Sequence, residues 1–544
     1  MSELQEPSKE GRLGAGFLLA GLVGTVIVTS YLVVAMQRSL WIDEGYSVYL
    51  SAKGLRGILD GLKVDSGPPL YYVLLTLWRQ AFGDSEISVR APSLVCYVLS
   101  LIVVYRCGRA LFSDRSRASY AVLFYGLGFL AIQAAAEARM YALLALAVAA
   151  STLFFVRAFL AEKRGWRDAA AYAVAVVVGS FTHYWFFLTL VAQGLCGLVA
   201  LPRRGVARLA AIQAFAVTPF LVLWSSTMLA QAGNGSIAWI PKPNATLLKD
   251  TLIALTGNGV SPFATYLGLV ALLLVARRYP EIERSRSAVL ENRKLAVVLA
   301  VLVMIPLLLP LALSFVKPVF LARCTVVAAC PLALLLAMGL GRLTTPAVRL
   351  AVSVLLVAEA ALGLWVRAAT APDMTDKYTA QCLTRCGLRG DVLVFTTISR
   401  LAVQYHLARM GAWGRFEVVT FPAEIDGHPG WRDVRAMLGR RAAIEAEADA
   451  VVDRIDSYLA RNPYAMIWVL YGYDTEVTGV LKGALDRRFA PVDQIELLGE
   501  SSAAHRQILA YASLPLSKTG VGPGRRPSGR MSWGASGTSG PGNP

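Results

Sequence analysis

Charged residues are scarce in this chain of 544 residues, and their scarcity excludes most classes of soluble protein. Only 16% of the residues are Asp, Glu, Lys or Arg, whereas 56% are hydrophobic. Soluble globular domains carry about 25% charged residues. The composition therefore indicates an integral membrane protein. It excludes a cytosolic enzyme, a disordered chain and a small secreted domain built on disulfides.

Cysteine is also rare, and no pair of the seven cysteines has the spacing of a zinc finger or a haem attachment site. Two of them, Cys382 and Cys386, lie in a polar segment at i, i+4. This helical spacing is unfavourable for a disulfide but leaves one open in an oxidising compartment. The other five lie in apolar runs, where cysteine acts as a small hydrophobic residue: Cys96, Cys107, Cys196, Cys324 and Cys330.

Long apolar runs, in contrast, are abundant. A helix needs about 20 mainly apolar residues to cross a bilayer. The first run is too long for a signal peptide, and we divide the run at 169–200 into two short helices that turn at His183. We predict eleven spans, near 14–36, 89–111, 118–136, 138–160, 169–182, 184–200, 208–229, 261–279, 295–315, 319–340 and 347–367.

The net charge of +17 comes from basic residues that lie at the ends of these spans. Membrane proteins collect Lys and Arg in cytoplasmic loops, so this charge does not indicate nucleic-acid binding. With eleven spans, the basic clusters near 106–117, 163–167, 203–208, 277–278 and 342–349 all fall on one side. The pattern predicts a cytoplasmic N-terminus and places everything after residue 368 outside. We interpret 69–83, which is apolar but short, as an interfacial helix on the outer side.

The chain changes character near residue 370. Residues 1–369 are predicted to form the membrane domain, with a first outer loop at about 37–88. Residues 370–515 alternate strand-like and helix-like segments, which predicts a soluble α/β domain outside the membrane. The strands are expected at 391–396, 416–420, 465–472 and 506–512, and the helices at 399–410, 443–461 and 474–488. The tail at 516–544 is basic, rich in Gly, Ser and Pro, and expected to be disordered.

Ionisable residues recur at the predicted outer ends of the spans, where they are functional candidates because burying a charge near lipid is costly. Each motif also has a simpler interpretation. Asp43 could lie in a solvated loop and cap the next helix, Arg90 could extend to the membrane surface, Glu137 and Arg139 could pair with each other, and His183 could be structural. The outer-side candidates are Asp43, Glu44, Tyr46, Lys63, Asp65, Tyr71, Arg90, Glu137, Arg139, Tyr141, His183, Tyr184, Lys317 and Arg323.

Together these motifs resemble the C-superfamily glycosyltransferases, in particular the family 39-like branch. That branch includes the protein O-mannosyltransferases and bacterial transferases that act on lipid A and envelope glycans. The resemblance lies in the Asp-Glu pair after the first helix, PPLYYVLLTLWRQAFGDSEISVRAPS at 68–93, EARMYAL at 137–143 and THY at 182–184. It is specific over about 40–200 and looser beyond. After residue 370 only the presence of an outer soluble domain is shared.

The resemblance implies a GT-C membrane fold of about eleven helices and an inverting transfer of a sugar from a polyprenyl-phosphate donor. The acceptor would be an envelope glycan, lipid or protein on the outer side of a bacterial inner membrane. It implies that Asp43 is the catalytic base, while Glu44 and Asp65 orient the sugar or support a metal. A departing phosphate needs positive charge rather than a proton, and the candidates are Arg139, Lys317, Arg323 and Lys63.

The remaining candidates would support the substrates: Tyr46, Tyr71, Arg90, Glu137, Tyr141, His183 and Tyr184. The family often has a His before the double Pro, where this chain has Gly67. We expect no metal cofactor, although some members of the superfamily use a divalent ion.

Two other functions remain open. A transporter or flippase for lipid-linked sugars would place ionisable residues near the bilayer midplane of repeated halves, and neither feature is seen. A structural assembly partner would use its outer domain to bind another envelope protein.

Overall fold

The computed structural model describes residues 9–112, 114–161, 165–233, 237, 239–256, 266–268, 270, 292–343, 345–370, 375–427, 437, 439–471, 475–497 and 506–513. The chain forms two compact units. The first comprises Met1–Tyr378, Ile398–His406 and Glu424–Asp433, and it holds the apolar helices. The second comprises Thr379–Thr397, Leu407–Ala423 and Val434–Pro544, and it holds a β-sheet.

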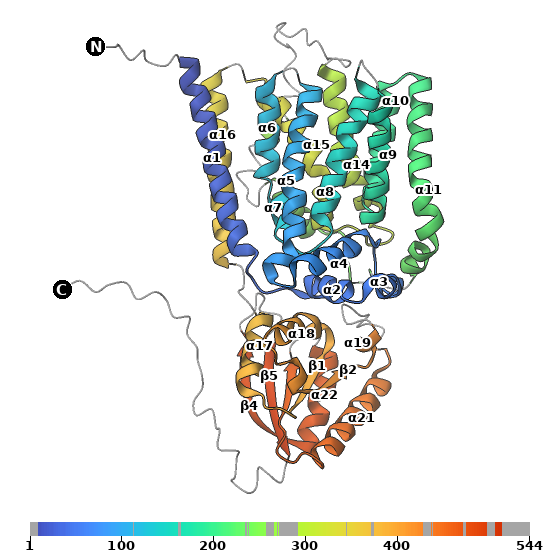
Figure 1. Cartoon of the computed structure of the whole chain (residues 1–544), viewed down its shortest axis with the longest axis vertical. Helices are drawn as coiled ribbons and strands as arrows, with labels where there is room; N and C mark the ends of the chain where they lie inside the picture. The colour runs from blue at the N-terminus through green and yellow to red at the C-terminus, as the bar shows by residue number, and fades with distance from the viewer. Residues whose placement is uncertain are drawn as a thin grey trace, which may run out of the picture. The chain divides into compact units, whose positions relative to one another are not determined.

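The first unit is a bundle of long apolar helices, as the composition predicts (Figure 1). Within the described residues, seven helices are long and apolar enough to cross a membrane. An eighth span results if α6 (Arg115–Gly126) and α7 (Phe129–Ala135), which meet at 62°, are taken as one. The seven are α1 (Lys9–Ala35), α5 (Glu86–Leu111), α8 (Tyr141–Phe155) with the π-helical turn η1 (Val156–Leu160), α11 (Arg203–Gly233), α14 (Asn292–Leu313), the 3₁₀ turn η2 (Ala322–Ala328) with α15 (Ala329–Leu340), and α16 (Pro346–Thr370).

Two shorter helices occupy the long apolar run at 169–200. Helix α9 (Trp166–Thr182) ends at His183, and α10 (Phe186–Ala200) begins three residues later. This confirms the predicted break at His183. Most of the expected span at 261–279 lies outside the described residues, so the total of eleven remains a prediction.

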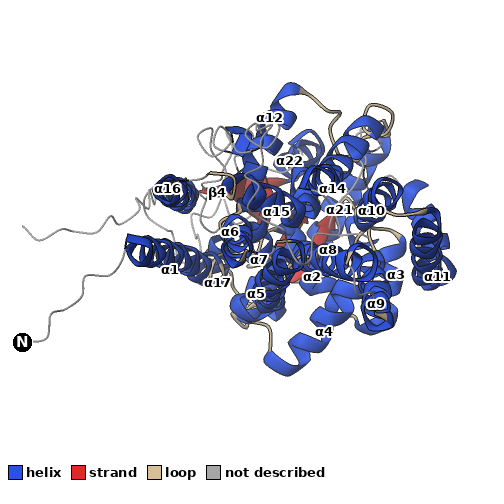
Figure 2. Cartoon of the chain, turned by 90° about the horizontal axis from the view of Figure 1, so that it is seen from above, coloured by secondary structure: helices blue, strands red, loops and turns tan. Residues whose placement is uncertain are grey.

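The helices differ in what surrounds them. Helices α8 and α15 lie inside the bundle, whereas α1 and α16 lie side by side at its edge, with α11 at the opposite edge (Figure 2). Helix α11 exposes large apolar side chains such as Phe215, which is 77% exposed. Apolar side chains that face outward are expected where lipid is the solvent. The chain is therefore a multi-pass membrane protein.

Three short helices lie across one end of the bundle: α2 (Ile42–Ser51), α3 (Gly54–Lys63) and α4 (Leu70–Phe82) (Figure 1). Helix α4 has 13 residues, which is too few to span a bilayer. It buries Tyr71, Tyr72 and Leu75. The helix expected at 69–83 is thus present. Helix α12 (Ala245–Thr256) lies between the segments expected to span the membrane at 208–229 and 261–279.

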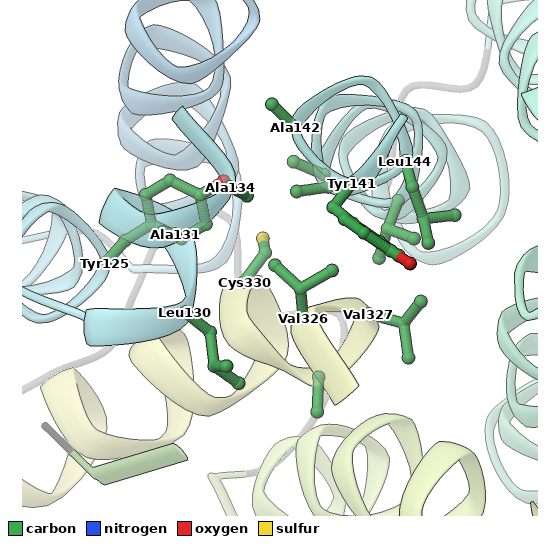
Figure 3. Close-up of a cluster of buried hydrophobic side chains, with 14 of the residues drawn as sticks. Tyr125, Leu130, Ala131, Ala134, Tyr141, Ala142, Leu144, Val326, Val327 and Cys330 are labelled. Carbon is green, nitrogen blue, oxygen red and sulfur yellow. The ribbon is translucent and has the colours of Figure 1, made fainter. Parts of the chain in front are cut away.

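A cluster of buried side chains joins α7, α8 and the η2–α15 segment (Figure 3). It includes Leu130 from α7, Tyr141 from α8, and Val326 and Val327 from η2. Close packing in such a core restricts backbone position. The start of α8 and the start of η2 are therefore fixed relative to each other, which matters because both carry candidate residues.

The second unit contains a five-stranded sheet of order β2-β1-β3-β5-β4. Strand β1 pairs in parallel with β2 and β3, and β5 is antiparallel to β3 and β4. The strands are β1 (Val392–Thr396), β2 (Glu417–Phe421), β3 (Ile467–Tyr471), β4 (Phe489–Leu497) and β5 (Arg506–Ser513).

The helices and turns that accompany these strands in the sequence are α17 (Thr375–Cys386), η3 (Thr397–Ser399), α18 (Arg400–Arg409), η4 (Trp413–Arg415), α19 (Glu424–Gly427), α21 (Arg441–Leu459) and α22 (Thr475–Arg488). The expected strands and helices are all present, and β4 and α17 are additional. Strand β4 escapes the sequence pattern because it is an edge strand that contains Pro491 and has a register shift beside it.

Cys382 and Cys386 are both thiols in α17, so the disulfide that the sequence left open is not formed. The boundary expected at 369/370 remains a prediction, and the tail at 516–544 lies outside the described residues.

Candidate functional site

The first turn of α2 carries the two adjacent carboxylates. Trp41 precedes the helix in an extended conformation, and its backbone N–H donates to Glu44 Oε2 at 3.3 Å. Acidic residues are favourable in a first turn because they face the unpaired N–H groups and the positive end of the helix dipole. The local sequence therefore explains why the helix begins here. The surroundings of the two acids differ.

Glu44 is completely buried, and both of its carboxylate oxygens accept hydrogen bonds. Its two oxygens accept from Arg90 Nε at 2.7 Å and Arg90 Nη2 at 2.6 Å. Oε1 also accepts the backbone N–H of Ala138 at 2.7 Å. A buried charge is tolerated only when it is paired and hydrogen-bonded. Glu44 therefore joins α2 to α5 and to the turn before α8.

Arg90 uses its remaining donors on the end of α1 and the residues after it. Nη1 donates to the carbonyls of Met36 at 3.0 Å and Arg38 at 2.8 Å, and Nη2 donates to Ser39 at 2.9 Å. These carbonyls otherwise lack partners at a helix C-terminus. The side chain is 3% exposed, so the interpretation that Arg90 extends to the membrane surface is wrong.

Arg139 lies against α2 rather than against Glu137. Its Nη1 donates to the backbone carbonyl of Asp43 at 3.1 Å and to Ser47 Oγ at 3.2 Å. Its Nη2 lies 3.8 Å from Asp43 Oδ2. The side chains of Glu137 and Arg139, both of which the structure describes, therefore do not pair with each other, and the simpler interpretation of this motif is wrong.

Asp43 lies between two guanidinium groups. Its Oδ2 is 3.0 Å from Arg323 Nη1, in addition to the Arg139 contact. The Asp43 side chain is 25% exposed and that of Arg323 is 24% exposed, although Asp43 Oδ2 itself is buried. One carboxylate and two cations thus lie together. They come from three segments far apart in the sequence: the start of α2, the turn before α8 and the start of η2.

Aromatic rings surround Arg323. Its guanidinium carbon lies 5.3 Å from the ring centre of Trp41, 5.6 Å from that of Tyr141 and 5.7 Å from that of Trp239. A guanidinium within about 6 Å of a ring face is attracted by the ring quadrupole. The rings hold the side chain in place without neutralising its charge.

Asp65 is a second acid close to this cluster. It accepts a hydrogen bond from Tyr46 and one from the backbone N–H of Ser66. Burial raises its pKa to about 6, although the charge of Arg139 opposes the rise. Burial, together with the charge of Asp65, likewise raises the pKa of Tyr46. Near neutral pH, Asp65 is therefore mostly ionised and Tyr46 is a hydrogen-bond donor.

Glu137 is half-buried nearby and accepts a hydrogen bond from Gln133 Nε2 at 2.9 Å. Burial, followed by the negative charge of Glu44, raises its pKa to about 7. Glu137 is therefore close to half protonated at neutral pH.

His183 is held in its neutral form. Burial, together with the positive charges of Arg139 and Arg323, lowers its pKa to about 3. Its Nδ1 accepts the backbone N–H of Trp185 at 3.1 Å, and its Nε2 lies 3.9 Å from Cys324 Sγ. An imidazole with these partners positions the break between α9 and α10 and is not a proton acceptor of ordinary strength.

The remaining candidates occupy different places. Tyr71 is buried in α4, with its ring centre 5.8 Å from that of Tyr72. Lys63 has a side chain that is 65% exposed and pairs with Asp60 at 2.8 Å. Lys317 is exposed and donates to the carbonyl of Ala232 at 2.6 Å. The structure therefore places Arg139 and Arg323 at Asp43, and it gives the two lysines other partners.

Two residues of this region were not among the candidates predicted from the sequence. Ser47 contacts Arg139 and lies one helical turn after Asp43, a spacing that could have indicated it. Gln231, which is 3% exposed at the end of α11, bonds the segment around Asp65. Nothing in its local sequence distinguishes it. Among the described residues, no group of three or more His, Cys, Asp or Glu side chains is placed to hold a metal ion.

Comparison with known proteins gives a match to a family model and matches to solved structures. Residues 66–229 match the family model described as dolichyl-phosphate-mannose-protein mannosyltransferase. The comparison with curated protein sequences gave no match.

Among solved structures, the chain is similar to ArnT from Cupriavidus metallidurans in the apo state. The two are 14% identical with a TM-score of 0.56, over 91% of this chain and 97% of that one. The same protein bound to undecaprenyl phosphate matches over the same shares, with 14% identity and a TM-score of 0.53. The chain thus has the fold of ArnT, and its residues 66–229 match the dolichyl-phosphate-mannose-protein mannosyltransferase model.

Proposed function

We propose that this protein transfers a sugar from a polyprenyl-phosphate donor to a hydroxyl group of an acceptor, with inversion at the anomeric carbon. The observation that carries the proposal is the Asp43 carboxylate, which lies partly exposed between Arg139 and Arg323. The family match and the likeness to a protein that binds undecaprenyl phosphate support a lipid-phosphate donor.

The reaction needs one base and no acid. The acceptor oxygen attacks the anomeric carbon, the bond from that carbon to the phosphate oxygen breaks, and its electron pair leaves with the phosphate. The proton of the acceptor hydroxyl passes to the Asp43 carboxylate. Because phosphate leaves without being protonated, the second carboxylic acid of a glycosidase is unnecessary.

Arg139 and Arg323 would stabilise the negative charge that grows on the departing phosphate. Guanidinium groups suit this task because they remain charged and donate in a fork that matches phosphate oxygens. Without substrate they pair with Asp43. A bound phosphate would share these cations, and Asp43 would then be more available to accept a proton. Their positions favour them over Lys63 and Lys317 as phosphate ligands.

Asp65 would orient the sugar, because an ionised carboxylate accepts hydrogen bonds from hydroxyl groups. Glu44 and Arg90 would act indirectly by fixing α2, since every donor of Arg90 is occupied. Tyr46, Tyr71, Glu137, Tyr141, His183 and Tyr184 would form the walls and supports of the site.

We propose that the site faces the outer side of a bacterial inner membrane, with the N-terminus in the cytoplasm. Helix α5 begins at the site and ends in Arg106 and Arg109, and α11 has Arg203, Arg204 and Arg208 at its far end. A helix of 31 residues is roughly 46 Å long, more than the thickness of the hydrocarbon core. The basic residues therefore lie at the opposite end of the bundle, where the positive-inside rule places the cytoplasm. The acceptor would be an envelope glycan, lipid or protein.

The test is transfer from a panel of radiolabelled polyprenyl-phosphate hexoses and pentoses to membrane extracts, with purified wild type and Asp43→Asn. We expect wild type to use one donor and the variant to lose about 10³-fold in rate, because a positioned base contributes roughly 10²–10⁴. The variant should keep the thermal stability of wild type. Near wild-type transfer by Asp43→Asn would remove Asp43 as the base. No transfer with any donor, but movement of a lipid-linked sugar across proteoliposomes, would favour a flippase instead.

A further inference from the structure

Gln231 makes an unusually complete set of hydrogen bonds near the end of α11. Its Oε1 accepts the backbone N–H of Gly67 at 3.1 Å and the hydroxyl of Tyr184. Its Nε2 donates to the backbone carbonyls of Leu62 at 2.6 Å and Gly67 at 3.2 Å. A side-chain amide has two donors and two acceptor positions, and all of them are used in this buried residue.

The partners of Gln231 lie on either side of Asp65 in the sequence. Helix α3 ends at Lys63, and the chain then turns before the double proline at 68–69. Gly67 has φ +111°, a conformation that favours glycine. Gln231 therefore holds both ends of segment 62–67, whose middle carries Asp65.

The amide is itself held in place. Tyr184, which donates to Gln231 Oε1, accepts a hydrogen bond from Trp224 Nε1 at 3.0 Å. Lys317 donates to the carbonyl of Ala232, the next residue along α11. The end of α11 is thereby fixed to its neighbours, and segment 62–67 is fixed to the end of α11.

We propose that Gln231 is a positioning residue for the transfer reaction. By holding segment 62–67, it keeps the Asp65 carboxylate against Tyr46 and close to Asp43 and Arg139. The inference rests on the proposed function for its catalytic consequence, but the clamp itself is a property of the fold.

The chemistry of the clamp requires an amide. Glutamate at 231 would have no donor for the two carbonyls and would add a negative charge beside Asp65. Leucine has a similar size but would leave buried backbone groups unsatisfied, which is more costly than losing a hydrogen bond on the surface.

The first test is hydrogen exchange of the backbone amides in 62–67, measured on the full chain in detergent. We expect Gln231→Leu to exchange about tenfold faster or more than wild type in this segment, because its bonds to Leu62 and Gly67 are lost. The matched control is Gln213→Leu. Gln213 also lies in α11, but it donates to Tyr172 and to the carbonyl of Leu190, and it should leave the exchange of 62–67 unchanged.

The second test is a double-mutant cycle with Asp65→Asn. We expect Gln231→Leu to lower kcat about tenfold with a smaller change in the KM for donor. In the Asp65→Asn background the same substitution should have little further effect, because the group that it positions is already altered. Tyr184→Phe removes only one bond of the clamp, so a reduction in kcat of about threefold is expected. This variant keeps the proposal testable if Gln231→Leu does not fold.

Each outcome decides a different point. Unchanged exchange of 62–67 in both Gln231→Leu and Tyr184→Phe would overturn the clamp. If the losses in kcat caused by Gln231→Leu and Asp65→Asn are fully additive in the double mutant, the positioning role is overturned. If wild type transfers no sugar from any donor while Gln231→Leu still exchanges faster, the proposed function fails and the clamp stands.

Discussion

Asp43 and Glu44 are neighbours in the sequence, yet the structure gives them opposite surroundings. Glu44 is inaccessible and is bound by Arg90 and by the backbone of Ala138. Asp43 is partly exposed, and its Oδ2 faces two arginines. Successive residues of a helix point about 100° apart, so one acid enters the bundle and the other lines its rim. An Asp-Glu pair can therefore combine one structural and one chemical carboxylate.

The largest expected effect is a loss of stability when Glu44, the structural member of this pair, is replaced. Glu44→Gln leaves Arg90 as a buried charge without its anion, and removing one partner of such a pair costs about 3–5 kcal/mol. We expect a clear loss of thermal stability in detergent, or loss of expression. Asp43→Asn is the matched control and should melt close to wild type. Equal stabilities for the two variants would contradict the division of roles.

The next effect concerns the cations at Asp43. Arg323→Ala should weaken use of the donor by about 10²-fold in kcat/KM, the usual order for losing one strong donor to a developing anion. Arg323→Lys should recover only part of this loss, because an ammonium lacks the planar fork of a guanidinium. Steady-state kinetics with the donor varied measures both. If Arg323→Ala changes the KM for acceptor alone, Arg323 does not bind phosphate.

A smaller effect is expected at Glu137, whose pKa in the folded protein is about 7 against an ordinary value of 4.5. An acid with a raised pKa retains its proton in the folded state, so its contribution to stability is present at low pH and lost as pH rises from 4.5 to 7. One pKa unit corresponds to about 1.4 kcal/mol, so the loss is at most about 3.5 kcal/mol. The melting temperature of wild type should fall more steeply over this range than that of Glu137→Gln. Parallel curves would show that Glu137 does not titrate there.

The smallest effect is expected at Lys63. Its side chain is 65% exposed and pairs with Asp60 on the surface of α3, and exposed pairs are worth about 0–1 kcal/mol. Lys63→Ala should therefore lower the free energy of unfolding by no more than about 1 kcal/mol and leave the KM for donor within about twofold of wild type. A tenfold rise in that KM would restore Lys63 as a phosphate ligand and would extend the site beyond the two arginines.

Much of the fold was predictable from local sequence. The apolar runs indicated the bundle, the break at His183 and the short helix α4, because a membrane requires long apolar segments with internally bonded backbones. The alternation of strand and helix indicated the second unit. Strand β4 was missed because proline and charged residues are tolerated at a sheet edge and obscure the pattern.

The site was only partly predictable. The motifs contained Asp43, Arg139 and Arg323, but they did not indicate which cations lie at Asp43 or that Arg90 is structural. The sequence did not indicate Gln231 as a site residue, because a single glutamine in a long apolar helix has no distinguishing feature until its partners are known.

The sequence by itself determined that this is a membrane protein with an α/β unit near its C-terminus, and it marked the segments where charge gathers. These properties follow from hydropathy and local periodicity, which each segment carries independently. Only the tertiary structure decided that Glu44 pairs with Arg90, Asp43 with Arg323, and segment 62–67 with Gln231. Such pairings depend on how distant helices pack, and the free energy that selects them comes from burying and satisfying groups that no short stretch of sequence contains together.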